Sequence, residues 1–534
     1  MNDTPSSGKK TATPNRPLLL VDGTVVDGSG DAPRRANVLV RGERIEDIGP
    51  IPAVPDWETI DCSGLHIAPG FIDVHSHGDQ EILRHLPNKV LQGVTTEVVG
   101  NCGFSLFPTL PNPGGEMLTG ELFDGDPTEG LADTAAYFSD LEAKGSRVNV
   151  AALTGHSALR VFTMRARRHA GEHELKQMEE VLDRCLASGS IGFSTGLNCI
   201  PSGFADFGEL VRLCRVVRKH DAFYTSHQRD YKFKVVEAVD EALNLGRTTG
   251  VPVQLSHLQV VGQKNWEKLA IVLDHVAKAV DEGVDVAMDA YPYLAGSCSL
   301  TQLLPSWSVE GGIPRLLERL SSTASYERIA AETDDYMANT WDDIVICGVG
   351  GEGAQEIVGK SVARIAAGRS DEAGHNQYAP CVALDLLREY AGDVRIISFN
   401  NSEDNLRSVI THELNMVITD GLVADGISHP RTFGTYPKFL GEYVREKKWM
   451  SLAEAIVKTS ALAARRFGLA GRGTIEPQNF ADLMVFDADR IGTASDYECP
   501  ERDPEGVHHV FVNGRAVVRD GRLTEERPGL ALAH

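Results

Sequence analysis

Short apolar runs of strand type alternate with longer segments of helical period through the middle of this chain. Eight such runs occur, at residues 69–75, 94–100, 147–153, 190–195, 222–227, 252–257, 284–290 and 416–420. Most are followed by amphipathic stretches such as EHELKQMEEVLDRCLASG and KVVEAVDEALNLGRTTG. This alternation predicts parallel βαβ units, and eight units predict a closed (β/α)8 barrel of the TIM type. A doubly wound open sheet is the alternative that the pattern leaves open.

The two ends of the chain have a different sequence pattern from the middle. Residues 17–67 and 469–534 contain short β-type runs, separated near the N-terminus by turns such as Asp-Gly and Arg-Gly. We therefore expect one small β-sandwich built from both termini, on either side of a barrel at residues 68–468. Residues 1–16 are polar and have no apolar segment, so we expect a disordered tail there rather than a signal peptide.

A long segment between the last two apolar runs interrupts the alternation. We place this insertion at about residues 295–395, because loops in such barrels are usually only a few residues long. It contains helical stretches (IPRLLERLSS, SYERIAAETDDYMAN) and strand-like ones (DDIVICGV, VRIISF). Since the insertion emerges on the side of the βα loops, we expect it to be either a lid that closes over a site or a rigid addition to the barrel.

Charge and cysteine content restrict the partners and the compartment. The formal net charge is -23 and the pI is near 5.2, which argues against nucleic acid or an anionic membrane as a partner. No run of eighteen or more apolar residues suggests a transmembrane span. The nine cysteines form no disulfide framework, and no secretory leader precedes them, so we expect a cytoplasmic protein.

Side chains that can bind a metal follow the candidate strands. They are His75 at the end of the first run and His77 just beyond it, Cys102 after the second, and His227, His257 and Asp420 at the ends of the fifth, sixth and eighth. In a barrel the carboxyl ends of all strands open onto one face, so these groups are expected to converge. The pattern therefore predicts a metal centre, although a single His pair alone would more often be a surface or core feature.

The ligand types indicate zinc, which prefers imidazole nitrogen and thiolate sulfur in tetrahedral geometry. Cys102, His227 and His257 form a natural set of three ligands, and His75 with His77 could complete a second, weaker site, with Cys102 between the two. Gly100 and Gly103 on either side of Cys102 would permit the tight turn that aims its thiol inward.

Longer motifs in the sequence indicate a protein family. The motifs are PGFIDVHSHGD, GVTTEVVGNCGFS, TGHSALR, GFSTGL, SHQRD, SHLQVVGQKNW, DAYPYLAGS, ITDG, HPRTFGTYPKFLG and FADLMVFD. In these the chain resembles the metal-dependent amidohydrolase superfamily and, within it, the N-acyl-D-amino-acid deacylases, or D-aminoacylases. Most binuclear relatives bridge their metals with a carboxylated lysine on the fourth strand. The fourth run here, SIGFSTGL, has no lysine, and a cysteine in its place is the deacylase arrangement.

The resemblance implies roles for these residues. Cys102, His227 and His257 would hold one tightly bound Zn²⁺, while His75 and His77 would line a second, weakly filled position. Asp420 would be the catalytic base, taking a proton from the attacking water and returning it to the leaving amine.

The substrate is less closely defined. Arg431 in HPRTFG matches the family arginine that binds the substrate's α-carboxylate, a task suited to a bidentate guanidinium. Tyr291 or Tyr293 in DAYPY is a candidate helper, with barrel packing as the alternative for either ring. Gln259 departs from the family, whose deacylases usually carry a lysine there as a second cation. Either Arg431 suffices, or the substrate differs.

We therefore expect a zinc-dependent hydrolase of linear amides that acts on a small molecule, an N-acyl-D-amino acid or a related N-acylated compound. The alternative within the superfamily is a cyclic amidase of hydantoinase or dihydroorotase type, against which the missing lysine counts. A third hypothesis is a non-catalytic scaffold with the same fold, against which the presence of all six candidate groups counts. The oligomeric state is not readable from the sequence.

Overall fold

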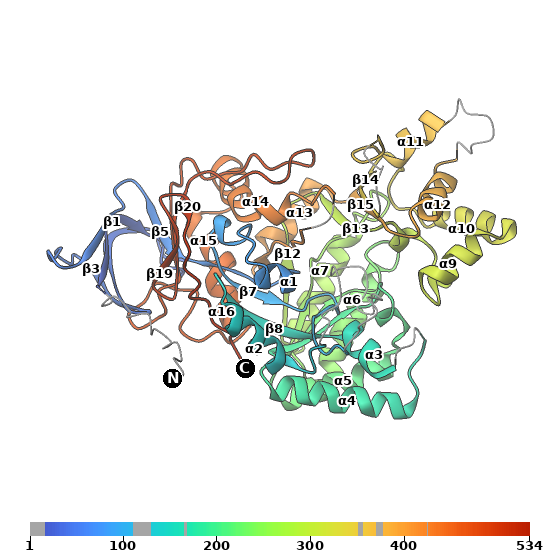
Figure 1. Ribbon diagram of the computed structural model, residues 1–534, viewed down its shortest axis with the longest axis horizontal. Coiled ribbons are helices and arrows are strands. Elements are labelled where there is room, and N and C mark those ends of the chain that lie inside the picture. The colour runs from blue at the N-terminus through green and yellow to red at the C-terminus, as the bar shows by residue number, and fades with distance from the viewer. Residues whose placement is uncertain are drawn as a thin grey trace, which may run out of the picture.

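A parallel barrel forms the centre of the computed structural model, which describes residues 16–110, 130–164, 168–350, 356–369, 378–423 and 426–533 (Figure 1). The expected disordered tail therefore lies almost entirely outside the described residues. The barrel strands are β6 (Phe71–Asp73), β7 (Val94–Val99), β8 (Asn149–Gly155), β9 (Gly192–Gly196), β10 (Phe223–His227), β11 (Val253–Leu255), β12 (Val286–Ala290) and β16 (Asn415–Val417).

These strands confirm the eight predicted runs and their parallel order. Each strand pairs with its neighbours in the sequence β6-β7-β8-β9-β10-β11-β12-β16. The seam between β16 and β6 is bridged just beyond the strands, where the Asp420 N–H donates to the His75 carbonyl at 2.9 Å and the His77 N–H donates to the Gly421 carbonyl at 3.1 Å. The predicted strands extend too far at several ends, since β11 stops before His257 and β16 stops before Asp420.

Helices cover the outside of the barrel. Between the strands lie α1 (Asp79–Leu83), α2 (Thr134–Lys144), α3 (His156–Met164), α4 (Glu172–Ala187), α5 (Phe207–Lys219), α6 (Val235–Thr249), α7 (Lys268–Asp281) and α13 (Glu403–Thr411), and after β16 come α14 (Arg431–Lys438), α15 (Leu452–Ile456) and α16 (Leu462–Arg466). Helix α5 shows why they form: the Asp206 carboxylate caps it by accepting from the Glu209 N–H, and Leu210, Leu213 and Val217 recur on one buried face.

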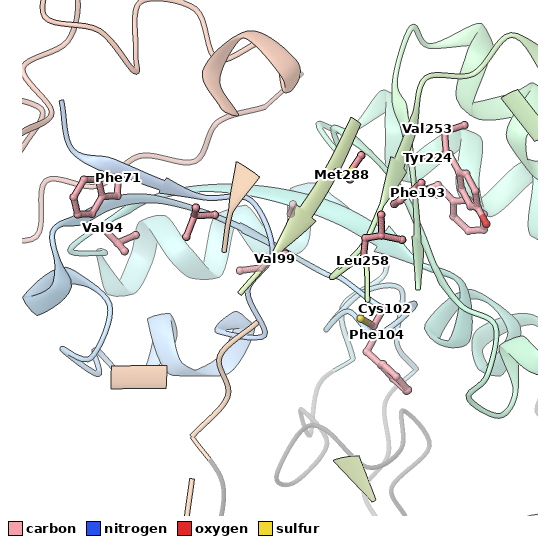
Figure 2. Packing of buried hydrophobic residues seen from close by; sticks show 14 of the residues in the cluster. Phe71, Val94, Val99, Cys102, Phe104, Phe193, Tyr224, Val253, Leu258 and Met288 are labelled. Carbon is pink, nitrogen blue, oxygen red and sulfur yellow. The ribbon is translucent and has the colours of Figure 1, made fainter. Parts of the chain in front are cut away.

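The main apolar core lies between these helices and the strands. Figure 2 shows residues of this core along the strands, from Phe71 and Val94 on one side to Tyr224 and Val253 on the other. No helix in the described part of the chain is long and apolar enough to cross a membrane.

Both ends of the chain contribute strands to one sheet beside the barrel, as predicted. The N-terminal strands are β1 (Leu18–Val25), β2 (Arg34–Arg41), β3 (Arg44–Gly49), β4 (Glu58–Asp61) and β5 (His66–Pro69), and the C-terminal ones are β17 (Leu483–Phe486), β18 (Val507–Val512), β19 (Arg515–Arg519) and β20 (Arg522–Leu523). The two sets meet where β5 pairs antiparallel with β17. All nine strands are hydrogen-bonded in one continuous sheet with a core of its own.

The insertion projects from the barrel on the side away from the terminal sheet (Figure 1). Its helices are α8 (Ser306–Val309), α9 (Ile313–Leu320), α10 (Thr323–Asp335), α11 (Val362–Arg369) and α12 (Ala379–Glu389), and they share a separate apolar core with a three-stranded sheet. The strands of that sheet are β13 (Ala295–Ser299), β14 (Ile344–Val349) and β15 (Val394–Phe399).

The predicted strand-like segments of the insertion correspond to β14 and β15, whereas β13 is an addition to the prediction. Its sequence, AGSCS, is too small and polar to indicate a strand. It forms because it pairs antiparallel with β15 along its whole length. The domain limits given above stay a prediction, as does movement of the insertion as a lid.

Candidate metal centre and active site

Three of the predicted ligands occupy left-handed backbone conformations just beyond their strands. Cys102 has φ 54°, His257 has φ 33° and Asp420 has φ 46°. Such values cost energy in residues with a side chain, and they persist where the surrounding structure demands them. They end the strand ladder and turn the side chains toward the barrel axis, which explains why the strands stop earlier than the apolar runs predict.

Glycines make the turn at Cys102 possible. Gly100 and Gly103 have φ 78° and 79°, and a Cβ on Gly100 would lie 2.1 Å from the Leu153 carbonyl oxygen of β8. No larger residue could occupy that place without moving a barrel strand. Figure 2 shows the resulting position of Cys102 beside Phe104 and Leu258.

The Cys102 thiol contacts two histidines. Its Sγ atom is 3.2 Å from His75 Nε2 and 3.4 Å from His257 Nε2. His227 joins through Nδ1, which lies 3.0 Å from His257 Nε2. One ligand atom from each of His75, Cys102, His257 and Asp420 lies within 4.8 Å of the others.

These distances fit a zinc site. In a tetrahedral zinc site two ligating nitrogens lie about 3.4 Å apart, and a nitrogen and a thiolate sulfur about 3.6 Å apart, given the usual bond lengths. Burial raises the pKa of the Cys102 thiol well above its usual value, and the nearby Asp420 carboxylate adds to the effect. Burial and the neighbouring His257 hold the pKa of His227 well below its usual value. Neutral imidazoles are ready to bind a metal, and a cation would supply the charge that the thiolate needs.

His75 and His77 both lie close to Asp420. The Asp420 Oδ1 atom is 3.5 Å from His75 Nε2 and 3.1 Å from His77 Nε2. The structure thus brings four of the six predicted metal-binding side chains into one group, His75, Cys102, His257 and Asp420. His227 joins this group through its contact with His257, and His77 through its contact with Asp420.

Asp420 is held as a carboxylate although it is buried. Burial alone would raise its pKa, but the Arg431 charge and a hydrogen bond with His77 outweigh this effect and hold the pKa well below its usual value. Arg431 opens helix α14 and places Nη1 2.8 Å from Asp420 Oδ2. An ionised carboxylate of this kind can act as a base.

A cavity of about 640 Å³ opens beside the cluster. His227, His257, Asp420 and Arg431 reach it from the barrel, and residues of the insertion such as Gly296, Cys298 and Met337 form the opposite wall. This volume suits a small molecule.

Of the predicted substrate-binding residues, Arg431, Tyr291 and Gln259 line the cavity. The Arg431 guanidinium lies over the Tyr291 ring at 4.6 Å, and the Tyr291 hydroxyl donates to Gln259 Oε1 at 3.4 Å. Tyr293 is not among the described lining residues. Its hydroxyl donates to the Pro430 carbonyl at 3.3 Å, so it supports the backbone next to Arg431.

Comparison with known proteins identifies the family of the chain. The model of the amidohydrolase family matches residues 58–198 and 377–518. It thus spans the first four barrel strands, the last one and much of the terminal sheet.

The chain belongs to the amidohydrolase family.

Among relatives of this amidohydrolase, N-acyl-D-glutamate deacylase of Alcaligenes xylosoxydans xylosoxydans is 38% identical over 96% of either chain. D-aminoacylase of the same organism is 35% identical over 97% of either chain. A crystal structure of N-acyl-D-glutamate deacylase from Bordetella bronchiseptica, complexed with zinc and a phosphonate mimic of the tetrahedral intermediate, has a TM-score of 0.81. It is 34% identical, and the match covers 98% of this chain and 100% of that one.

The hydantoinases are more distant from this amidohydrolase. L-hydantoinase from Arthrobacter aurescens is 15% identical, with a TM-score of 0.55, and the match covers 97% of this chain and 99% of that one. This similarity shows the shared fold alone.

Two side chains that orient the histidines of the amidohydrolase were missed by the sequence analysis. Asp289 lies at the end of β12, with Oδ1 3.4 Å from His75 Nδ1, and it also accepts from the His257 N–H at 2.6 Å. The Tyr231 hydroxyl lies 3.0 Å from His257 Nδ1, and this contact leaves Nε2 facing Cys102. The sequence contains features that could have indicated both residues, since Asp289 begins the DAYPY motif at a strand end and Tyr231 follows SHQRD.

Proposed function

We propose that this amidohydrolase is a zinc-dependent hydrolase that removes the acyl group from N-acyl-D-amino acids or related N-acylated compounds. The observation that carries the proposal is the position of the Cys102 thiol between His75 and His257, with the ionised Asp420 beside them. The named deacylases that match nearly the whole chain support the linear amide and the D configuration.

In this proposal Cys102, His227 and His257 hold one zinc ion tightly, and His75 with His77 lines a second, weaker position. When bound, zinc supplies a Lewis acid that activates water and polarises the carbonyl group of an amide. Asp289 and Tyr231 keep the histidine rings turned toward the centre.

Asp420 acts as the general base. Its carboxylate is ionised beside Arg431, so it can accept a proton from water and pass it to the nitrogen of the leaving amine. Arg431, supported by the Tyr291 ring, binds the carboxylate of the substrate next to the scissile amide. Gln259 contributes a neutral amide to the same wall.

Assays of zinc-loaded protein test the proposal directly. We expect hydrolysis of N-acetyl-D-amino acids to exceed that of N-acetyl-L-amino acids and of a hydantoin. Faster hydrolysis of the hydantoin would favour a cyclic amidase. Absence of turnover with every compound would favour the scaffold hypothesis.

Asp420→Asn separates catalysis from zinc binding. We expect the variant to keep its tightly bound zinc and to lose about 10²- to 10⁴-fold in kcat, the usual contribution of a positioned proton acceptor. Asp274→Asn, on the exposed face of α7, is the matched control and should keep wild-type activity. An active Asp420→Asn enzyme would remove this residue as the base.

We further propose a small-molecule substrate as the partner and the cytoplasm as the location. The nine cysteines all lie in the described part of the chain, no disulfide joins any two of them, and most are buried, which suits a reducing compartment. The acidic net charge of -23 is unsuited to nucleic acid or an anionic membrane.

A further inference from the structure

Lys232 places an ammonium group in the wall of the substrate cavity without a partner of opposite charge. It lies in the loop between β10 and α6, five positions after His227. Its side chain lines the cavity together with Tyr336 of the insertion. Among the described residues no hydrogen bond or ion pair satisfies Nζ, which lies over the Tyr336 ring at 5.1 Å from its centroid. Burial lowers the pKa of Lys232, against the opposing influence of Cys298 and Asp230.

The carboxylate closest in sequence is already engaged. Asp230 Oδ1 accepts from the backbone N–H groups of Lys232 at 2.6 Å and of Lys234 at 3.0 Å. Its other oxygen accepts from the Tyr336 hydroxyl. The Lys232 ammonium is therefore left facing the cavity, where an unpaired charge is costly and an anionic ligand would be favourable.

The other cations of the cavity wall differ in this respect. Arg229 donates to both oxygens of Glu241, at 2.9 and 3.0 Å. Arg431 is paired with Asp420 at the metal centre. Among the described residues that line the cavity, Lys232 is thus the cation that forms no ion pair with a carboxylate of the protein.

Two residues of strand β13 line the cavity wall, Gly296 near Tyr291 and Cys298 near Lys232. Gly296 marks the inner end of the wall, since a Cβ there would lie 3.0 Å from the Tyr291 hydroxyl oxygen. Cys298, which influences Lys232, is two positions further along the same strand and also lines the cavity. Alternate residues of a strand face the same side about 7 Å apart. A molecule anchored at Arg431 would therefore meet Lys232 with a group several bonds away.

We propose that Lys232 binds a second carboxylate of the substrate, so that the preferred substrates are N-acyl-D-amino acids carrying an anionic group besides the α-carboxylate. This inference rests on the proposed function and narrows its substrate class. The second carboxylate belongs either to the amino-acid side chain, as in a D-glutamate, or to a dicarboxylic acyl group. Lys232 is thus a residue of substrate specificity, outside the bond-breaking machinery.

Three substrates and three variants test this. We expect the wild-type, zinc-loaded enzyme to have a higher kcat/KM for N-acetyl-D-glutamate or for N-succinyl-D-leucine than for N-acetyl-D-leucine. Whichever dicarboxylate is preferred identifies the source of the anion. In Lys232→Met the ratio of kcat/KM between that dicarboxylate and N-acetyl-D-leucine should fall at least tenfold, mainly through KM. Lys232→Arg should retain the preference, and Lys278→Met, on the exposed face of α7, should leave the ratio at its wild-type value.

An equal loss on all three substrates would show that Lys232 only supports the Tyr336 contact, and an unchanged ratio would overturn the proposal outright. A binding measurement separates this outcome from failure of the proposed function. Calorimetric titration of the zinc-loaded protein with glutarate and with valerate needs no turnover. We expect glutarate to bind more tightly than valerate in the wild type and this advantage to fall at least fivefold in Lys232→Met. Equal glutarate affinity in both proteins would refute the role of Lys232 even if deacylation is confirmed.

Discussion

Cys102 joins the two halves of the proposed metal centre, and its place depends on a few backbone angles. Its φ of 54° lies between the positive values of Gly100 and Gly103. The thiol then stands 3.2 Å from one histidine and 3.4 Å from another. A side chain in this position can contribute to both the tight and the weak metal position.

Replacing this thiol should remove the tightly bound metal. We expect Cys102→Ala, purified without added zinc, to retain far less than the one zinc ion per chain of the wild type, because two neutral imidazoles alone bind zinc weakly. Cys214→Ala is the matched control, since Cys214 is a fully buried thiol on α5 outside the cluster. Elemental analysis of both proteins checks the assignment. Full retention of zinc by Cys102→Ala would rule out Cys102 as a ligand.

Helices α3 and α5 are joined to each other and to the turn that carries Cys102. His156 opens α3, and its Nε2 lies 2.9 Å from Glu209 Oε1 on α5, which also accepts from Arg160. The next residue of α3, Ser157, donates its N–H to the Gly103 carbonyl at 2.8 Å. The ion-pair network between the helices is therefore connected to the turn that carries Cys102.

The stability of this pair of helices should depend on pH. Burial opposes ionisation of Glu209, but the His156 hydrogen bond and the Arg160 charge outweigh it and lower its pKa to about 2. A lowered carboxyl pKa stabilises the fold above the unfolded value of about 4.3, and this contribution of about 3 kcal/mol is lost as the pH falls toward 2. Glu209→Gln should therefore unfold at lower temperature than the wild type at pH 7.

The difference in melting temperature should narrow as the pH falls below about 4.3. Glu237→Gln, exposed on α6, is the control and should melt like the wild type at each pH. A gap that stays constant between pH 7 and pH 3 would contradict the assigned role of the Glu209 charge.

A buried polar network joins the terminal sheet to the barrel. Arg472 pairs with Asp482, and Asp482 Oδ2 accepts from the Asn149 amide at 3.2 Å, at the start of β8. The Asn513 amide donates to Asn149 Oδ1 at 2.8 Å. The network lies at the amino ends of the strands, opposite the metal centre, so it stabilises the molecule without touching the chemistry.

Breaking this network should lower stability and leave catalysis intact. We expect Arg472→Met to lose about 3–5 kcal/mol of unfolding free energy, because Asp482 is left as an uncompensated buried charge. Arg519→Met removes an exposed pair with Glu58 and should lose at most about 1 kcal/mol. Thermal unfolding of the zinc-loaded proteins, with kcat measured below the transition, compares the two. Equal losses in both variants would show that the network does not couple the sheet to the barrel.

The barrel could be read from the sequence because its strands are short, apolar and separated by amphipathic helices. The same reading placed His75, Cys102, His227, His257 and Asp420 at strand ends, where barrel geometry brings distant residues together. It missed β13, whose small polar residues form a strand only through pairing with β15. It also missed Asp289 and Tyr231, because their roles depend on which histidine nitrogen each one contacts.

The order of apolar runs and polar strand ends in this chain was sufficient to predict the fold and the convergence of side chains that can bind a metal, since these follow from periodicity and from donor type. Distances and pairings required the folded chain. Asp420 is ionised because Arg431 reaches it, and Lys232 is uncompensated because Tyr336 and two backbone N–H groups engage Asp230. Such contacts join residues far apart in sequence, so packing in three dimensions sets which charges are paired and which remain for a substrate.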